Sequence, residues 1–434
     1  MNVDDALAFL DAHINLEVRS GRFEGLSLDA MADIVRLWDD PHTAYPVIHI
    51  TGTNGKGSTA RIITRLLMAH GLRVGTYTSP HLERYNERIR LDDKEIDDID
   101  FAAVVQEFAG LESLLAQRPS HFECLTACAL SYFAAEAIDV AVIEVGVLGR
   151  YDATNIVTAD VAVITNIGRD HTDFQGDWRR TIAQEKAGII KPTSTLVLGE
   201  TATDLRAVFL AEQPAQSLVV GEDFELLANR LAVGGRQLDL RTPYQTLTEL
   251  FLPLHGAHQG RNAALAIMAT SAFFGRALDS DVVAEGLAQV EVAGRFEVVR
   301  RNPLVVLDGA HNPDGAEAAL AVLEEGFQVA GRSILVFGML EGRDPETMLV
   351  SLQAAEFDQV ITCTPTSPRA LPADEVALAA ASLGITCRVA ATIEQGIGWA
   401  LDAATPSDLV LITGSLYLVG SARAVLRKRA RSAS

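Results

Sequence analysis

A glycine-rich segment, TGTNGKGST at residues 51–59, holds the residues with the clearest capacity for chemistry. Its glycines let backbone amides approach a phosphate closely, and Lys56 supplies a mobile positive charge for β- and γ-phosphates. Residues 47–50 are typical of a buried strand and residues 58–69 of a helix, whose positive end would face the same point. This order of elements predicts a nucleotide-binding phosphate loop rather than a chance turn. The expected phosphate contacts are Gly52, Thr53, Asn54, Gly55, Lys56, Gly57 and Ser58.

This loop departs from the common pattern G-x-x-x-x-G-K-[ST] at one position. A hydroxyl normally follows the lysine and binds Mg²⁺, but Gly57 stands there. Ser58 can contact phosphate, so the metal requires another hydroxyl. Thr78 and Ser79, in TYTSPHL, are the candidates, although Ser79 taken alone is better explained as a turn residue before a proline.

Two further metal-ligand candidates follow predicted strands. Glu144 ends the apolar run VAVIEVG, where an ionised carboxylate is costly unless it is paired or binds a metal. His171 follows the strand expected over 161–166. Both would lie at the carboxyl ends of parallel strands, where α/β sheets bind ligands. Because Mg²⁺ prefers oxygen ligands, His171 taken alone fits a polar loop residue better.

Lys186 lies in the apolar stretch IAQEKAGII. A lysine amine stripped of water loses its proton more readily and becomes a nucleophile toward carbon dioxide. For one isolated lysine, a charged group that reaches out to water from an apolar surface is the commoner case.

Short apolar strands alternate with amphipathic segments along most of the chain, which predicts parallel sheets covered on both faces. Further strands are expected over 140–145 and 161–166, with a helix over 122–137. Residues 217–253 alternate and predict antiparallel hairpins at a sheet edge. A second α/β unit begins at Leu304, with the strand segments LVVLD, SILVFG, QVITC, ITCRVA and DLVLITG.

The composition excludes several classes of protein. With 434 residues, 48% of them hydrophobic, the chain is neither disordered nor a small disulfide scaffold. No apolar run reaches the roughly 18 residues that span a bilayer. The start, MNVDDALAFL, lacks the basic region of a secretory signal. We therefore expect a cytoplasmic protein.

The charge limits the expected partners. Lys plus Arg number 36 and Asp plus Glu 57, which gives a net charge of −21. Such a chain binds nucleic acid and anionic membranes poorly. It can still bind anionic small molecules at a locally positive site, and we expect it to be a monomer.

Ten segments, in order along the chain, carry a resemblance to a known family: VIHITGTNGKGST, YTSPHL with NERIR, FECLTACALSYF, EVGVLGRYDATN, ITNIGRDHTDF, EKAGIIKP, HGAHQGRNAALA, GRFEVV, VVLDGAHNPDG and LITGSLYLVG. The series resembles the folylpolyglutamate synthase and dihydrofolate synthase family of the Mur ligase superfamily, from Ala6 to Leu426. The resemblance implies a P-loop ATPase domain with a mostly parallel sheet, residues 1–293, and a smaller Rossmann-like α/β domain, residues 294–434. Substrate sites would lie in the cleft between them.

The resemblance also implies a role for each matching residue. Ser79 and Glu144 would bind one Mg²⁺. His171 would bind a second Mg²⁺ together with Lys186, which is carbamylated in the family. The implied catalytic residues are Lys56, Lys186, His171, Asp308 and His311.

The remaining implied roles concern the nucleotide and the two substrates. Asn262 resembles an adenine-side contact and Arg295 a phosphate contact. Asp308 and His311 resemble a clamp on nucleotide and incoming glutamate. Arg88, Asp152 and Ser415 would contact substrate, with Asp152 on the pterin side and Ser415 on the glutamate side; taken singly, each is equally a capping or turn residue.

Three departures from the family pattern concern the substrate side. Leu148 replaces a glycine and Tyr151 an aliphatic residue in GVLGRYDATN. Arg169 replaces an uncharged residue, and GMLEGRD, with Glu341 and Gly342, replaces GM-x-x-DKD. A side chain at a glycine position can reshape the turn or narrow the pocket.

The implied activity is ATP-dependent addition of L-glutamate to dihydropteroate, to folates or to both, through an acyl phosphate. One alternative is a peptidoglycan Mur ligase, whose further domain for the UDP sugar would have to fit within about 45 residues before the first strand, below the usual domain size. Another is a non-catalytic nucleotide switch, which would need neither a carbamate nor a second metal.

Overall fold

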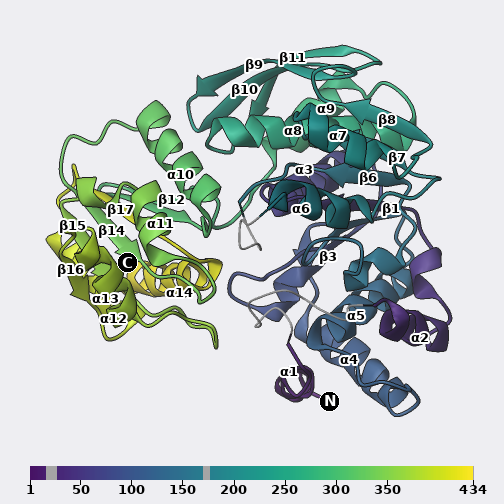
Figure 1. The fold of residues 1–434 in the computed structure, drawn as a ribbon, viewed down its shortest axis with the longest axis horizontal. Coiled ribbons are helices and arrows are strands. Elements are labelled where there is room, and N and C mark those ends of the chain that lie inside the picture. Colours follow the sequence, from purple (N-terminus) through teal and green to yellow (C-terminus); the bar gives the residue numbers. More distant parts are fainter. Residues whose placement is uncertain (16–26, 170–175, 434) are drawn as a thin grey trace. The chain divides into compact units, whose positions relative to one another are not determined.

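The computed structural model describes residues 1–15, 27–169 and 176–433, and contacts divide the chain into two compact units. Both are α/β units, as the sequence predicts (Figure 1). Unit 1 comprises Met1–His81, Tyr85–Pro253 and His258–Glu291. Unit 2 comprises Leu82–Arg84, Leu254–Ala257 and Val292–Ser434.

An eight-stranded sheet forms the centre of unit 1, in the order β4-β3-β2-β5-β1-β6-β7-β8. The pairs β2–β3 and β3–β4 are antiparallel and all others are parallel. Continuous apolar runs form the central strands because both faces are covered. The strands are β1 (Val47–Thr51), β2 (Val74–Tyr77), β3 (Ile89–Leu91), β4 (Lys94–Glu95), β5 (Val140–Glu144), β6 (Val161–Ile164), β7 (Thr195–Leu198) and β8 (Gln216–Val219).

Helices flank this sheet, and their starts follow local sequence signals. Helix α5, for example, begins with a capping box in which Ser120 and Glu123 each accept the other's backbone N–H. The helix predicted over 58–69 is α3, which begins two residues earlier. The helices are α1 (Val3–Asp11), α2 (Asp29–Leu37), α3 (Lys56–Ala69), α4 (Asp98–Glu112), α5 (His121–Ala135), α6 (Trp178–Ala187), α7 (Thr203–Leu210), α8 (Ala257–Phe274) and α9 (Ser280–Ala288), with short 3₁₀ turns η2 (Pro41–Thr43), η3 (Tyr85–Arg88) and η4 (Ala153–Ile156).

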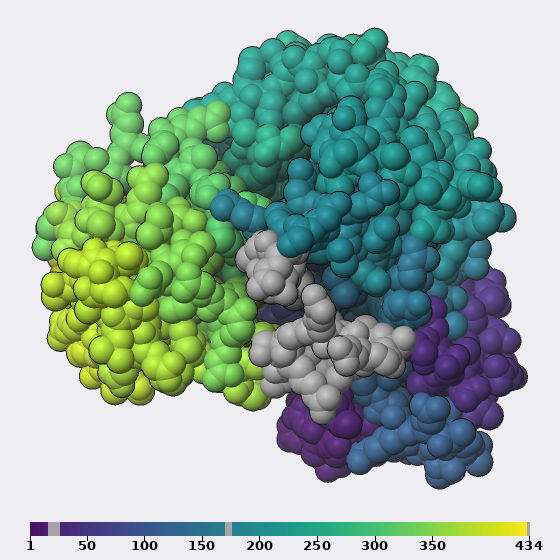
Figure 2. All heavy atoms as spheres, in the orientation of Figure 1, coloured from purple at the N-terminus to yellow at the C-terminus, as the bar shows by residue number. Residues whose placement is uncertain are grey.

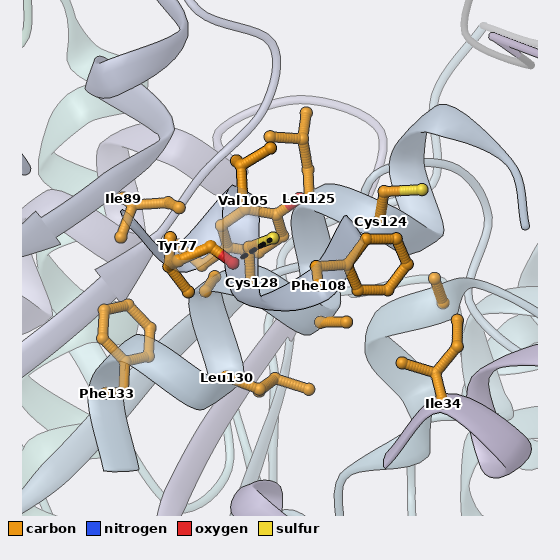
Figure 3. Packing of buried hydrophobic residues seen from close by; sticks show 14 of the residues in the cluster. Ile34, Tyr77, Ile89, Val105, Phe108, Cys124, Leu125, Cys128, Leu130 and Phe133 are labelled. Carbon is orange, nitrogen blue, oxygen red and sulfur yellow. Dashed lines mark hydrogen bonds between the residues drawn. The ribbon is translucent and has the colours of Figure 1, made fainter. Parts of the chain in front are cut away.

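One core cluster of unit 1 packs α1, α2, α4 and α5 against the sheet. Tyr77 from β2 and Phe133 from α5 lie among aliphatic side chains in it (Figure 3). Cys124 and Cys128 are buried, free thiols of this cluster. The cluster packs α5 against the sheet whose strand β1 leads to the phosphate loop.

The hairpin region differs in two respects from its prediction. Three strands form a separate antiparallel sheet instead of the edge of the main sheet, with a turn at Gly234. Residues 217–219, included in the predicted hairpins, belong to β8, which pairs parallel with β7. The short run of β8 ends in two buried residues and extends the main sheet, whereas alternation begins only beyond it. The separate sheet comprises β9 (Glu225–Ala232), β10 (Gly235–Arg241) and β11 (Thr246–Leu252).

Unit 2 is built on a six-stranded sheet in the order β12-β13-β17-β14-β15-β16. Only β12 is antiparallel to its neighbour, and all five predicted strand segments are present. The strands are β12 (Glu297–Arg301), β13 (Leu304–Asp308), β14 (Ser333–Phe337), β15 (Gln359–Thr362), β16 (Cys387–Val389) and β17 (Leu409–Thr413). The helices are α10 (Pro313–Gly326), α11 (Pro345–Ser351), α12 (Ala373–Ser382), α13 (Ile393–Ala403) and α14 (Leu416–Ala433), with the 3₁₀ turn η5 (Ala354–Glu356).

Two short pieces from earlier in the chain complete unit 2. Glu83 accepts hydrogen bonds from Arg423 at 2.8 Å and from Arg427 at 3.0 Å, both on α14. The ring of His255 lies 5.8 Å from that of Phe296 and 5.2 Å from that of Phe327. Unit 2 is therefore not one continuous stretch of chain.

Figure 2 draws the heavy atoms of both units as spheres, and side chains close the visible face of each unit over its backbone. Among the described helices, none combines the length and the apolar character needed to cross a bilayer.

Candidate active site

The glycine-rich segment forms a loop between the central strand β1 and helix α3, as predicted. The N-cap of α3 is Gly55, which has no side chain to cap the helix, so the first amides of α3 can receive an anion. Lys56 Nζ donates to the carbonyl oxygens of Gly52 at 3.1 Å and Thr53 at 3.3 Å. Ser58 is buried in the first turn of the helix. The Lys56 side chain therefore folds back over the phosphate loop, where its amino group can also reach a bound phosphate.

The end of β6 holds the loop from the side. Thr53 N donates to Asn166 O at 2.9 Å, while Thr165 Oγ1 donates to Asn54 O at 2.7 Å. A Cβ at Gly52 would lie only 1.8 Å from Thr165 Oγ1, so a larger residue cannot occupy this position unchanged. The sequence analysis missed Thr165 and Asn166, although polar residues at the end of a buried parallel strand are a usable signal.

Helix α8 brings Asn262 to the same loop. Gly55 has φ +87°, and a Cβ there would lie 2.5 Å from Asn262 Oδ1. Asn262 Nδ2 donates to Gln259 Oε1 at 3.0 Å, which fixes the amide. The predicted nucleotide contact thus lies directly against the phosphate loop.

Glu144 and Ser79, the predicted ligands of one metal, also meet. Glu144 ends β5 beside β1, is 4% exposed, and its Oε2 accepts the backbone N–H of Ser79 at 3.2 Å. A Cβ at Gly57 would lie 3.4 Å from the same oxygen. A hydroxyl residue in place of Gly57 would therefore project toward Glu144. The arrangement fits a relocated metal site, because a carboxylate and a serine gather beside the loop without the usual loop hydroxyl.

Lys186 reaches the phosphate loop from α6. It is 4% exposed, and its Nζ donates to Gly52 O at 2.9 Å. This lysine therefore does not extend into solvent from an apolar surface. His171, the other residue predicted at a second metal, lies outside the described residues.

The turn at residues 146–155 lies between β1 and α6. Thr51 Oγ1 donates to Leu148 O at 2.7 Å, and Arg150 N donates to Glu185 O at 2.8 Å. Leu148 has φ +61°, a left-handed conformation that suits the glycine expected there. Tyr151 is 46% exposed. Leu148 and Tyr151, which depart from the family pattern, thus lie on one turn.

Asp152 organises this turn. Its carboxylate accepts N–H groups from Val147 at 2.8 Å and from Thr154 at 3.0 Å, and also the Thr154 hydroxyl. Burial raises the pKa of Asp152, and these hydrogen bonds oppose the shift. The residue is 7% exposed, so little of the carboxylate remains for a substrate.

Arg88 is almost fully buried, and its Nε donates to His81 Nδ1 at 3.0 Å. Burial, and then the nearby Arg88 charge, lower the pKa of His81 to about 3. The guanidinium also lies over the Tyr85 ring at 5.4 Å. Arg88 thus holds the segment that follows Ser79, and its substrate role stays a prediction.

Unit 2 gathers its predicted residues at the ends of β13 and β17. Asp308 accepts N–H groups from Phe296 and Ala310, each at 2.8 Å, and burial raises its pKa while Arg295 opposes the shift. Arg295 Nη1 donates to Gly309 O at 3.3 Å, and His311 Nδ1 lies 2.9 Å from the same oxygen.

Ser415 follows β17 on the adjacent loop. It is 1% exposed, and its Oγ accepts the Leu418 N–H at 3.1 Å at the start of α14. The backbone of Gly414 donates to Ala310 O at 3.2 Å, which joins the two loops. Glu341, by contrast, is exposed on the loop after β14, where its N–H donates to Arg369 O at 2.8 Å.

Models of one protein family match most of each unit. The Mur ligase middle domain matches residues 50–270, and the Mur ligase, glutamate ligase domain matches residues 294–416. A dihydrofolate synthase/folylpolyglutamate synthase of Mycobacterium tuberculosis is 39% identical, over 92% of this chain and 89% of that protein.

Solved structures agree with these matches. Mycobacterium tuberculosis folylpolyglutamate synthase complexed with ADP has a TM-score of 0.91 at 37% identity, over 98% of each chain. The bifunctional folylpolyglutamate synthase/dihydrofolate synthase of Yersinia pestis, complexed with AMPPNP and Mn ion, has a TM-score of 0.84 at 29% identity, over 98% of each chain.

The left-handed backbone at Leu148 predicts a difference between two truncations. Leu148→Gly and Leu148→Ala both remove the isopropyl part of the side chain, but alanine keeps the Cβ, and only glycine adopts this conformation without strain. We expect Leu148→Gly to be more stable than Leu148→Ala by about 1 kcal/mol in urea unfolding. Equal stability of the two variants would contradict the strain.

Proposed function

The chain belongs to the Mur ligase family and, within it, to the folylpolyglutamate and dihydrofolate synthases, and we propose from this premise that it joins L-glutamate to a pterin or folate carboxylate at the cost of ATP. The observation that supports this most is the convergence on the phosphate loop. Lys56 and Lys186 share the Gly52 carbonyl, and Glu144 with Ser79 lies beside Gly57.

The reaction requires activation because a carboxylate has no good leaving group. Transfer of the γ-phosphoryl group of ATP to the acceptor carboxylate gives an acyl phosphate and ADP. The glutamate amine then attacks the carbonyl carbon, and phosphate leaves as the amide forms and the amine loses a proton. The protein's contribution is to position the reactants and to stabilise the anionic oxygens.

The chain's own groups suit the first step. The loop amides and Lys56 would bind the phosphates, and Asn262 would contact the nucleotide on its adenine side. Glu144 and Ser79 would hold Mg²⁺, which supplies Lewis-acid stabilisation of phosphoryl oxygens when bound. The Yersinia pestis relative is complexed with AMPPNP and Mn ion, which supports a nucleotide and a divalent metal here.

A carbamylated Lys186 and His171 would hold a second Mg²⁺. Carbamylation adds carbon dioxide to the neutral amine and releases a proton, which converts a lysine into an oxygen ligand. Burial and contact with the loop support this role for Lys186.

Unit 2 would contribute to the nucleotide and to glutamate. Arg295 would contact phosphate, Asp308 and His311 would contact nucleotide and incoming glutamate, and Ser415 would contact glutamate. All four lie at or after the carboxyl ends of strands or on adjoining loops of one sheet, which supports a shared site within the unit.

Asp152 and Arg88 would lie on the acceptor side. The acceptor is dihydropteroate, a folate or both, and the turn that carries Leu148 and Tyr151 would adjust this choice. We expect Leu148→Gly to change the acceptor preference more than the KM for ATP.

We also propose a cytoplasmic monomer without nucleic-acid or membrane partners. The net charge of −21 supports this, because a strongly acidic chain is repelled by nucleic acid and by anionic membranes.

The activity itself can be tested with an acceptor panel. Enzyme, ATP, Mg²⁺ and glutamate are mixed with dihydropteroate, tetrahydrofolate or a UDP-muramyl acceptor, and phosphate release and product mass are measured. We expect glutamate-dependent release with at least one pterin acid and none with Lys56→Ala. Turnover of the muramyl acceptor alone would favour a peptidoglycan ligase, and ATP binding without any product would favour a nucleotide switch.

The metal role of Glu144 predicts a shift in magnesium dependence. Glu144→Gln should raise the Mg²⁺ concentration for half-maximal turnover at least tenfold, because a neutral amide is a weaker ligand than a carboxylate. Glu200→Gln is a matched control, since Glu200 is a buried carboxylate that follows β7 and accepts N–H groups from Ile167 and Ala202. An unchanged Mg²⁺ dependence in Glu144→Gln would remove this ligand from the proposal.

The carbamate role of Lys186 predicts loss of turnover without loss of nucleotide binding. Lys186→Ala and Lys186→Arg should both reduce turnover by at least 100-fold, since arginine keeps the charge but does not form the carbamate. Wild-type activity should also fall in buffer depleted of carbon dioxide and return with bicarbonate. Near-normal turnover of Lys186→Arg would show that only the positive charge matters.

A further inference from the structure

Three side chains link the strand before the phosphate loop to the turn at residues 146–155. His49 Nε2 lies 2.9 Å from Thr154 Oγ1, and this hydroxyl donates to Asp152 Oδ1. His49 lies in the middle of β1 and is 0% exposed, as is Thr154. Neither residue has a role in the function proposed above.

The hydrogen positions in the series His49–Thr154–Asp152 can be assigned by counting donors. Both oxygens of Asp152 accept a backbone N–H, and Oδ1 also accepts the Thr154 hydroxyl, so the single hydroxyl hydrogen of Thr154 is directed to Asp152. His49 Nε2 must then carry a hydrogen and donate it to the Thr154 oxygen. The opposite nitrogen, Nδ1, is buried without a hydrogen-bond partner among the described residues, which suits a bare lone pair better than an N–H.

The surroundings favour this neutral ring. Burial, and then the nearby Lys191 charge, lower the pKa of His49 to about 3. The imidazole therefore donates in one fixed direction instead of switching its charge near neutral pH.

The same strand also holds the turn at a second point. Thr51, two residues beyond His49 and so on the same face of β1, donates to Leu148 O. The next residue, Gly52, begins the phosphate loop. One short strand thus carries the loop and anchors both ends of the turn.

We propose that His49 is a positioning residue for the acceptor: through Thr154 it holds Asp152, and with it the turn at residues 146–155, at a fixed place relative to the phosphate loop. This inference rests on the proposed function, in which Asp152 lies on the pterin side. The carboxylate cannot turn toward another partner while Thr154 donates to it and Val147 holds its other oxygen.

Variants of Thr154 test the residue between His49 and Asp152 with little change in side-chain shape. Thr154→Val removes the hydroxyl, whereas Thr154→Ser keeps it. We expect Thr154→Val to raise the KM for the pterin acid at least tenfold with the KM for ATP within twofold of wild type, and Thr154→Ser to stay near wild type. Thr270→Val is the matched control, because it removes another buried hydroxyl, which donates to Ala266 O within α8.

Variants of His49 test the donor itself. His49→Gln places an amide N–H near the position of Nε2, whereas His49→Leu places no donor there. An acceptor KM near wild type in His49→Gln, together with a raised acceptor KM in His49→Leu, supports the proposed role of the His49 hydrogen bond. A rise in acceptor KM that is equal in both variants, or equal for ATP and acceptor, would indicate general damage and overturn the inference.

Imidazole ¹⁵N spectra of the wild-type chain supply a readout that needs no turnover. We expect a protonated Nε2 and a bare Nδ1 at His49, and a change in the Nε2 signal in Thr154→Val. A proton on Nδ1 would overturn the inference. A wild-type chain that turns over no pterin acid overturns the proposed function, whereas active wild type with an unchanged acceptor KM in Thr154→Val overturns this inference alone.

Discussion

Two lysine side chains, Lys56 and Lys186, donate to one backbone oxygen, that of Gly52. While Lys186 is not carbamylated, two amino groups that share one neutral acceptor create a locally positive site in a chain with a net charge of −21. Repulsion between like charges at this point is relieved when an anion binds, so a phosphate is a favourable partner. Hydrogen bonds from the end of β6 hold the loop that carries this oxygen.

The strand order explains how residues far apart in sequence reach that point. β1 lies between β5 and β6, and all three run in the same direction, so their carboxyl ends share one edge. Glu144 comes from β5, Thr165 and Asn166 follow β6, and the phosphate loop follows β1. This is the edge at which parallel α/β sheets place ligands, because loops and helix starts converge there.

Much of this could be predicted from residue patterns, since apolar runs specify strands and the glycine–lysine loop has a strict local form. The ordering of strands within a sheet depends on pairing, which periodicity does not encode. For this reason Thr165, Asn166 and the separate sheet of β9, β10 and β11 were missed. His49 was missed because a lone polar residue inside a strand gives no sign of its partner, and the contact to Thr154 spans 105 positions.

The discontinuity of unit 2 limits how the chain can be divided. Its core packing includes His255 against Phe296 and Phe327, and its ion pairs include Glu83 with Arg423. A fragment that begins at Val292 would leave both aromatic rings partly uncovered and the arginine without one of its carboxylates. Gene fusion, domain exchange or truncation just before Val292 would therefore yield an incomplete unit 2. Recombination between relatives would succeed best when Leu82–Arg84, Leu254–Ala257 and Val292–Ser434 come from the same parent.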